Sequence, residues 1–312
     1  MRYLLLLSIV LCMPLQAEWF RGNTHTHTSE SDGDSAPMTV AQWYATHGYH
    51  FLVITDHDKV TTIEQPPLLL IPGEEVTAFL PKKPAHVNAM GLAEAIAPQK
   101  GATVAETLQK NIAAVRDAGA IATINHPNFG WSFGSAEMLE TEGATLLEIY
   151  SGHPYVNMYG PPSVEQMWDD LLTAGRRIFA VAADDSHYFK VLGEPFGSHP
   201  GKGWIVVRAA KLDAKAILDA IARGDFYASS GVSIADYVVE GDTLTVTIEA
   251  RNGARYRTDF IGPHGRILGT STDVRATFSL PEDVAYVRAR VTDSNGRIAW
   301  LQPHFRTVTP VR

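Results

Sequence analysis

The chain repeats one local pattern that constrains its fold: short apolar runs that end in His, Asp or Glu. Three of these runs, each with a polar residue that follows it, are 51–54 with His57, 121–124 with His126 and 178–182 with Asp185. Continuous apolar runs of this length are typical of parallel strands that are buried on both faces. In α/β barrels the carboxyl ends of such strands converge on one rim, which carries the active site. Ionisable residues at only one end of buried strands are hard to explain as packing, so we expect a functional site there.

Segments with helical spacing alternate with these runs. Pro37 opens one of them and Gly48 follows its end, which is the usual arrangement of a starting proline and a terminating glycine. The alternation predicts an α/β fold. The expected strands cover residues 18–24, 51–55, 68–71, 85–90, 121–124, 146–150, 178–182 and 204–207, and the expected helices cover 38–47, 102–118, 163–174 and 215–223.

The pattern changes after about Gly231. Short runs of alternating polarity follow, and turn signals such as Asn252-Gly253 separate them. This texture is typical of a small antiparallel β-sandwich. We therefore expect a barrel domain over residues 18–230 and an all-β domain over residues 231–312.

Residues 1–17 have the composition of a secretory signal peptide. Arg2 provides a basic start, an apolar stretch follows, and Pro14 and Ala17 close it. The stretch is too short to span a bilayer as a permanent helix. We expect cleavage after Ala17, export to the periplasm or the medium, and no membrane anchor afterwards. Cys12 is the one cysteine of the chain, so the mature protein has no disulfide, thiol nucleophile or thiolate ligand.

The charge balance argues against a nucleic-acid polymer as a partner. The chain has 34 Asp and Glu against 26 Lys and Arg, which gives a formal net charge of −8. Proteins that bind nucleic-acid polymers need a basic surface to displace counterions. A small-molecule substrate is therefore expected, and the sequence predicts no particular oligomeric state.

His25 and His27 lie two residues apart, so in an extended chain their side chains share one face. Two imidazoles that converge from a strand end suit zinc, manganese or iron better than calcium or magnesium. Two solvated surface histidines are the alternative for this pair taken alone. The other strand-end residues favour a metal site, and the candidate ligands are His25, His27, Asp32, His57, Glu74, His86, His126, Asp185 and His187. One ion takes about four ligands, so this set can hold two or three divalent ions if carboxylates bridge them, and such ions activate water for hydrolysis.

The order and spacing of these residues resemble those of a known family. The segment His25–Gly33 resembles the first motif of the PHP (polymerase and histidinol phosphatase) superfamily, and Ile54–Asp58 resembles the second. The later motifs of the superfamily are also matched, in the same order, by similar residues: Gly73-Glu74, His86, His126 and Asp185-Ser186-His187. Within the superfamily, the chain resembles the secreted branch that includes carbaryl-hydrolase-like metallohydrolases.

The resemblance implies a distorted (β/α)7 barrel with a trinuclear metal site. The ligands it implies are His25, His27, Glu74 and Asp185 for the first ion, Glu74, His86 and His126 for the second, and Asp32, His57 and His187 for the third. Glu74 is thus expected to bridge two ions. We take Glu74, Asp185 and His187 as the catalytic residues.

Five further residues are expected to support the site. Asp56 and Asp58 are interpreted as groups that orient imidazoles rather than bind metal. Glu148 is expected to lie behind a ligand or, alternatively, to form a buried pair with an arginine of the barrel. His153 and His199 are candidates to face the substrate.

The leading functional prediction is hydrolysis of a small phosphate ester. In this hypothesis a hydroxide that bridges the metals is the nucleophile. A cation is also needed beside the phosphate, and Lys59, Lys190 and Lys202 are the candidates because they lie just beyond motif residues.

Two other functions remain open. The same metals can serve hydrolysis of a carbamate, carboxylic ester or amide, with an aromatic pocket formed by loop 129–133 together with Tyr150, Tyr155 and Tyr159. A third hypothesis is a non-catalytic secreted protein that binds metal or another ligand. A closed structural metal site would distinguish it, because catalytic sites keep an open coordination position.

Overall fold

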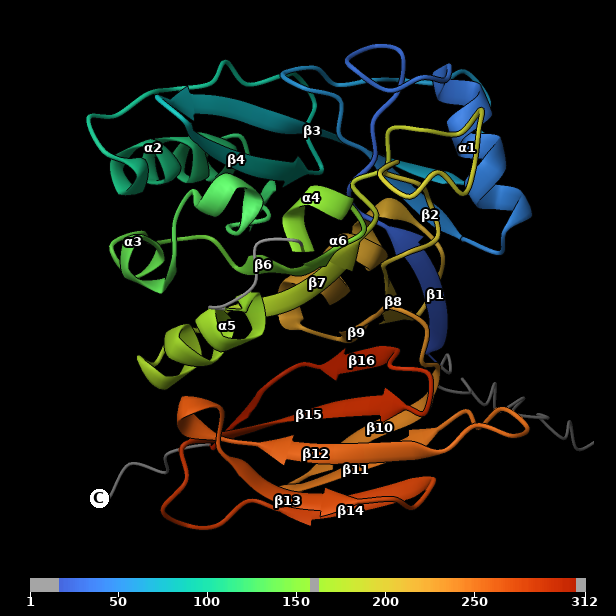
Figure 1. The fold of residues 1–312 in the computed structure, drawn as a ribbon, viewed down its shortest axis with the longest axis vertical. Coiled ribbons are helices and arrows are strands. Elements are labelled where there is room, and N and C mark those ends of the chain that lie inside the picture. Colours follow the sequence, from blue (N-terminus) through green and yellow to red (C-terminus); the bar gives the residue numbers. More distant parts are fainter. Residues whose placement is uncertain (1–16, 158–162, 307–312) are drawn as a thin grey trace, which may run out of the picture.

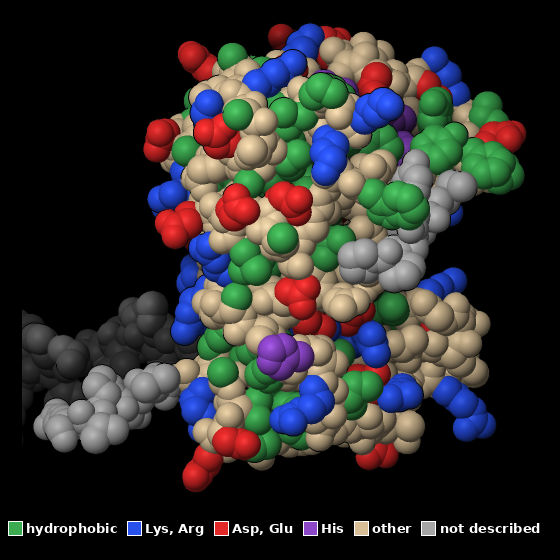
Figure 2. Space-filling view, turned by 60° about the vertical axis from the view of Figure 1, so that its left-hand side comes forward, with side chains coloured by type: hydrophobic (Ala, Val, Ile, Leu, Met, Phe, Trp, Pro, Cys, Tyr) green, Lys and Arg blue, Asp and Glu red, His purple; other side chains and the backbone are tan. Residues whose placement is uncertain are grey.

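The computed structural model describes residues 17–157 and 163–306. The expected signal peptide, apart from Ala17, lies outside the described residues. None of the helices in the described ranges is both long and apolar enough to cross a membrane. On the face shown in Figure 2, Lys and Arg side chains are interspersed with Asp and Glu.

The α/β prediction is confirmed by a large mixed sheet with helices packed on it (Figure 1). Its first seven strands are β1 (Glu18–Asn23), β2 (Phe51–Ile54), β3 (Leu69–Leu80), β4 (Lys83–Met90), β5 (Ile121–Ile124), β6 (Leu146–Ser151) and β7 (Phe179–Ala183). The order β1-β2-β3 is parallel, as is β5-β6-β7, and β4 lies antiparallel between the two groups. On its other side β1 pairs antiparallel with β8 (Trp204–Ala209), which pairs with β9 (Phe226–Ser229).

Capping residues mark the ends of several helices. They are α1 (Pro37–Thr46), α2 (Val104–Asp117), α3 (Ser135–Leu139), α4 (Pro154–Asn157), α5 (Val164–Thr173) and α6 (Ala214–Arg223), with 3-10 turns η1 (Phe129–Trp131) and η2 (Pro263–Gly265). Thr103 and Ser163 accept hydrogen bonds from backbone amides in the first turns of α2 and α5. They are therefore the N-caps of these helices, although the sequence predicted that they lie inside them. Gly224 ends α6 in the left-handed conformation at a φ of 79°.

Strand β3 extends well beyond the apolar run that predicted it. It forms a long hairpin with β4 in continuous register from Gly73 opposite Met90 to Leu80 opposite Lys83. The hairpin therefore contains Glu74 and Glu75 inside a strand rather than in a loop after it. Because successive side chains of a strand point to opposite faces, these two carboxylates point in opposite directions.

The segments that follow β1, β2 and β7 are hydrogen-bonded to one another. The amide of Asp185 donates to the carbonyl of His25, and the amide of His27 donates to the carbonyl of Ser186, both at 2.9 Å. On the other side, the amide of Thr55 donates to the carbonyl of Thr26 at 2.9 Å. The strand ends thus converge, although β7 and β1 are far apart in the sheet order.

The C-terminal strands form two β layers. One layer continues the large sheet, because β16 (Ile298–Leu301) pairs with β9. This layer also contains β15 (Tyr286–Asp293), β12 (Tyr256–Ile261) and β13 (Ile267–Ser271). The short strand β17 (His304–Phe305) pairs with β15. The other is a separate three-stranded sheet of β10 (Ile234–Glu240), β11 (Thr243–Ile248) and β14 (Arg275–Ser279). Apolar side chains from both layers share one core, among them Leu244, Val246, Phe260 and Val291.

Polar contacts also join the C-terminal strands to the α/β part. The guanidinium of Arg288 in β15 is 1% exposed and donates to both carboxylate oxygens of Asp169 in α5 at 2.7 Å. The side-chain amide of Gln302 donates to the carbonyl of Ala180 in β7 and accepts from its amide. The boundary expected near residue 230 therefore falls within a continuous sheet.

Candidate metal centre

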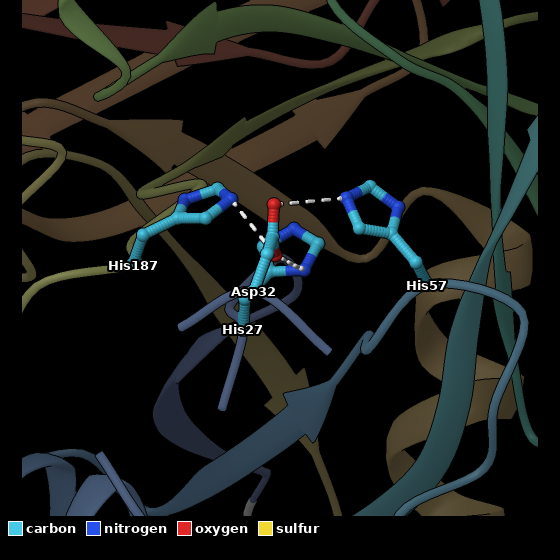
Figure 3. A group of neighbouring side chains, drawn as sticks. All are labelled: His27, Asp32, His57 and His187. Carbon is cyan, nitrogen blue, oxygen red and sulfur yellow. Dashed lines mark ion pairs between the residues drawn. The ribbon is translucent and has the colours of Figure 1, made fainter. Parts of the chain in front are cut away.

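Three imidazoles of the centre, those of His27, His57 and His187, surround Asp32 (Figure 3). One oxygen of Asp32 lies 3.3 Å from Nε2 of His187 and 3.5 Å from Nδ1 of His27, and the other lies 3.4 Å from Nε2 of His57. The loop that carries Asp32 folds back tightly because Gly33 lies against the backbone of His27, where a β-carbon would come within 2.8 Å. The short spacing from His25 to Gly33 therefore corresponds to a compact loop that brings Asp32 close to the imidazole of His27.

Glu75 lies at the middle of the centre and connects its groups of imidazoles. One carboxylate oxygen is 3.0 Å from Nδ1 of His86 and 3.2 Å from Nε2 of His126. The other oxygen faces three more imidazoles, at 3.5 Å from His25, 3.4 Å from His27 and 3.2 Å from His57. A single carboxylate therefore borders five of the six histidines in the centre.

The expectation that Glu74 bridges two ions is corrected by this geometry. Glu74 points to the opposite face of β3, where one oxygen accepts a hydrogen bond from the amide of Ile96 at 2.6 Å. Its other oxygen has no hydrogen-bond partner among the described residues, and burial raises the pKa of this carboxyl to about 7. Glu75 occupies the position that was expected for Glu74, and Glu74 is also removed from the expected catalytic set.

Asp185 completes the inner part of the centre. One of its oxygens is 3.4 Å from Nε2 of His25 and 3.4 Å from Nε2 of His27. Asp185 and His126 have positive φ angles of 48° and 20°. Such backbone conformations cost roughly 1–3 kcal/mol for residues other than glycine, and they persist where the surrounding structure enforces them. Each is the second residue after a buried strand, where the chain turns to aim a side chain inward.

The spacing of the donor atoms fits divalent cations. Two ligands at about 2.0–2.1 Å from a tetrahedral ion lie about 3.3 Å apart. The nitrogen–oxygen separations given above are 3.0–3.5 Å, and the Nε2 atoms of His25 and His27 are 3.2 Å apart. Nε2 of His86 is buried with no hydrogen-bond partner in the described structure. Buried imidazoles and carboxylates at this spacing are the donor set of a metal site.

Glu148 and Asn125 hold parts of the centre in place from behind. One oxygen of Glu148 is 3.2 Å from Nδ1 of His25, and the other accepts from the backbone amide of His126 at 3.0 Å. A proton on Nδ1 of His25 leaves its Nε2 free as a lone-pair donor toward the centre. Asn125 donates to Glu75 at 2.8 Å. Sequence reasoning missed Asn125, although its place just before His126 was a signal.

Asp56 and Asp58 act on the backbone and on hydroxyl groups rather than on imidazoles. Asp56 accepts hydrogen bonds at 2.7 Å from the amide and hydroxyl of Thr28 and from the hydroxyl of Ser31. Asp58 accepts from the amide of Thr77, whose hydroxyl lies 2.6 Å from Nδ1 of His57. Neither aspartate was expected to bind metal, and these contacts reach the imidazoles only through an intermediate residue: Ser31 lies 3.4 Å from Nδ1 of His27, and Thr77 lies beside His57.

The electrostatics of the centre favour bound positive charge. Burial raises the pKa of Glu75, but the neighbouring imidazoles of His86 and His25 outweigh burial and hold that pKa well below its ordinary value. Burial is the largest effect on His57 and lowers its pKa, but the hydrogen bond to Asp32 and the charges of Glu75 and Asp32 together outweigh burial and raise the pKa to about 9. A metal ion competes with protons for such nitrogens.

A cavity of about 310 Å³ opens onto the donor atoms. Apart from the expected ligands and Glu75, its lining consists of Phe79, Phe129 and His153. His199 is not part of the lining: its ring nitrogens lie 3.3 Å and 3.1 Å from the carbonyls of Tyr188 and Glu194, so it holds its own loop together. The expectation that His199 faces the substrate is thus corrected.

Apart from His153 and Phe129, the candidate substrate residues are absent from the described lining of this cavity. Lys59, Lys190 and Lys202 are absent from its lining, and Lys59 pairs with Glu30 at the surface. Tyr150 packs against Trp300 with ring centroids 5.9 Å apart. Three further aromatic candidates are accounted for as follows: Phe133 is buried in the core, Tyr155 packs against His153 with 43% of its surface exposed, and Tyr159 lies outside the described residues.

Comparisons with known proteins place the fold. No protein-family model matches the chain, and no curated protein matches it. A solved two-domain protein from Bacteroides vulgatus, described as containing a predicted PHP-like metal-dependent phosphoesterase, aligns with a TM-score of 0.52 at 14% identity. That alignment covers 93% of this chain and 95% of the other.

Two further solved structures are similar over a smaller part of the chain. One is a putative metal-dependent phosphoesterase from Bifidobacterium adolescentis, with a TM-score of 0.43, 16% identity, and coverage of 56% of this chain and 90% of the other. The second is an amidohydrolase from Chromobacterium violaceum, with a TM-score of 0.42, 16% identity, and coverage of 56% and 89%. At 14% identity the likeness to the two-domain protein is one of fold, and it extends over nearly the whole length of that protein.

Proposed function

We propose that this protein is a metal-dependent hydrolase of the PHP type that cleaves small phosphate esters. The observation that carries the proposal is the position of Glu75, whose carboxylate lies between two groups of imidazoles with ligand-like spacing. The order of the motifs along the chain and the fold likeness to the two-domain protein support it. The barrel closure typical of that family agrees with the hydrogen bonds between the segments after β1 and β7.

We assign three groups of residues to hold two or three divalent ions, with zinc, manganese or iron as candidates because imidazoles predominate. The groups are His25, His27, Glu75 and Asp185 for the first, Glu75, His86 and His126 for the second, and Asp32, His57 and His187 for the third. Ions held there supply Lewis-acid polarisation of the ester and a water nucleophile at neutral pH.

The protein's own side chains do the positioning. Asp185 and Glu75 provide buried negative charge that balances closely spaced cations, and Glu148 fixes the tautomer and ring orientation of His25. Phe79 and Phe129 line the cavity beside the ligands. Asp185 and His187 stay in the proposed catalytic set, with Glu75 in place of Glu74.

The open cavity favours catalysis over the non-catalytic hypothesis. Structural metal sites are closed by protein ligands, whereas catalytic sites keep room for substrate. Here a volume of about 310 Å³ borders the proposed ligands of all three groups. A second candidate reaction, hydrolysis of carbamates, carboxylic esters or amides, is favoured by one observation: no Lys or Arg is present in the cavity lining as described.

We also propose that the protein is exported through residues 1–17 and acts as a periplasmic or secreted enzyme of the branch that includes carbaryl-hydrolase-like metallohydrolases. The basic, apolar and small-residue order of that segment supports export. The motif order and the all-β C-terminal strands support the branch.

A substrate panel with metal-loaded protein tests the proposed reaction. The panel contains an aryl phosphate monoester, the matching phosphodiester and the matching aryl carbamate, each with added Mn²⁺ or Zn²⁺. We expect phosphate-ester turnover that a chelator abolishes and re-added metal restores, and that Asp185→Asn reduces by at least 100-fold. Turnover of the carbamate alone would select the second reaction, and no turnover with fully metallated protein would contradict both.

A further inference from the structure

Two phenylalanines in the cavity wall lie directly beside proposed metal ligands. Phe79 is edge-on to His86 with ring centroids 5.1 Å apart, and Phe129 is edge-on to His126 at 5.4 Å. The two rings come from different elements, since Phe79 belongs to β3 and Phe129 begins η1. His86 and His126 are themselves neighbours at 5.2 Å, so both aromatic rings flank the same group of ligands.

The direction of Phe79 follows from strand geometry. Glu75, Thr77 and Phe79 alternate along β3, so their side chains share the face that carries the metal centre. Phe79 is nevertheless 52% exposed, although most large apolar side chains among the described residues are buried. Ligand pockets are lined mainly by apolar and aromatic side chains, and Phe79 supplies such a ring to the wall of this cavity.

The same cavity offers no protein cation to a charged substituent. Its described lining contains three acidic and five imidazole side chains but no Lys or Arg, and residues 158–162 contain none in the sequence. The side chain of Asp32 is 53% exposed, so it adds negative charge at the accessible part of the lining. A second anionic group on the substrate, besides the ester group at the metals, would thus face carboxylates and aromatic rings of the cavity wall.

We propose that Phe79 and Phe129 bind an uncharged aromatic group next to the scissile bond, so that the preferred substrates are aryl esters with a single anionic group. This inference rests on the proposed phosphate-ester hydrolysis. The rings provide apolar area and edge-to-face contacts for a planar group. His153 completes the wall: its Nδ1 accepts from the amide of Tyr155 at 3.3 Å, which leaves Nε2 as the donor nitrogen of the neutral ring.

Binding of non-hydrolysable phosphonates separates the pocket from the chemistry. With metal-loaded protein, calorimetry should show phenylphosphonate binding at least tenfold tighter than methylphosphonate. Phe79→Ala and Phe129→Ala should each reduce that preference by about 3-fold to 10-fold, in line with the worth of an aromatic pair. Equal binding of the two phosphonates would overturn the inference while leaving the proposed function intact. Binding of neither would count against an anion site on the metals, and so against both.

Kinetics with charged and uncharged rings provide the second test. We expect 4-methylphenyl phosphate to have a kcat/KM at least tenfold higher than 4-carboxyphenyl phosphate, and comparable values would overturn the inference. Phe79→Leu, at a half-exposed position that tolerates change, keeps apolar volume without a planar ring and should lose part of the preference. Leu212→Ala removes an apolar side chain that is 41% exposed and outside the cavity lining, so it serves as the matched control. Metal content, measured by elemental analysis, must be unchanged in all variants for the comparison to count.

Discussion

Replacing Glu75 with Gln should dismantle two groups of ligands at once. The carboxylate lies 3.0–3.2 Å from His86 and His126 through one oxygen and 3.2–3.5 Å from His25, His27 and His57 through the other. Gln keeps the shape but removes the negative charge and replaces one acceptor oxygen with a donor NH2 group. Ions held on either side of Glu75 would therefore lose a shared ligand and the negative charge that offsets their mutual repulsion.

The size of the effect follows from the kind of contact. Loss of a group that only orients a ligand costs about 10–100-fold in metal affinity. A ligand shared by two ions should exceed the upper end of that range for each ion, which corresponds to about 2.7 kcal/mol or more. Activity should fall by orders of magnitude, because the nucleophile depends on the metals.

Glu74→Gln is the matched control on the same strand. Its side chain accepts one hydrogen bond, from the amide of Ile96, and the amide oxygen of Gln can still accept it. Metal affinity should stay within about threefold of the unchanged protein. Elemental analysis after dialysis against a graded chelator series, together with turnover of an aryl phosphate, measures both variants. Loss of metal in Glu74→Gln with full occupancy in Glu75→Gln would refute the assignment.

Three other predictions follow from the same geometry. Asp32→Asn should weaken only the group with His57 and His187, so chelator titration should show one ion lost and the others retained; loss of all ions would contradict separate groups. Glu148→Gln should lower metal affinity by about 10–100-fold through His25, and an unchanged chelator titration would count against this positioning role. Arg288→Met should lower the free energy of unfolding by about 3–5 kcal/mol in urea titrations because Asp169 stays buried without its partner, whereas adding Asp169→Leu should restore much of it.

The strands were predictable where the sequence pattern is local and strong. The run Phe51–Ile54 and the run Ile121–Ile124 are strands with nearly the expected bounds because continuous apolar residues need burial on both faces. The ionisable residues after them lie at one place because the segments after β1, β2 and β7 are hydrogen-bonded to each other. The motif spacing therefore anticipated the gathering of these side chains.

The choice between Glu74 and Glu75 was not available from the sequence. Adjacent carboxylates on a strand point to opposite faces, and pairing with β4, which sets Thr77 opposite His86, decides which face meets the centre. The role of Phe79 was hidden for the same reason, since β3 runs eight residues past Pro72. His199 was misread because backbone carbonyls of its own loop, rather than substrate, lie at its ring nitrogens.

The sequence pattern also did not show that the C-terminal strands are joined to the α/β part. Alternating polarity identifies antiparallel strands but does not show which strands they pair with. Here β16 joins β9, and Arg288 forms a buried ion pair with Asp169 in α5. Cutting the chain near Gly231 would expose the edge of β9 and leave that carboxylate unpaired.

The central claim is that Glu75 is shared by two metal ions within a multinuclear centre. Anomalous diffraction from crystals grown with Mn²⁺ or Zn²⁺ tests it most directly, because the peaks locate each ion and its ligands. We predict two or three peaks among the imidazoles, with one oxygen of Glu75 bonded to an ion beside His86 and His126 and the other to an ion beside His25 and His27. Peaks bonded to Glu74, or a fully metal-exposed crystal with no peak at the centre, would contradict the account.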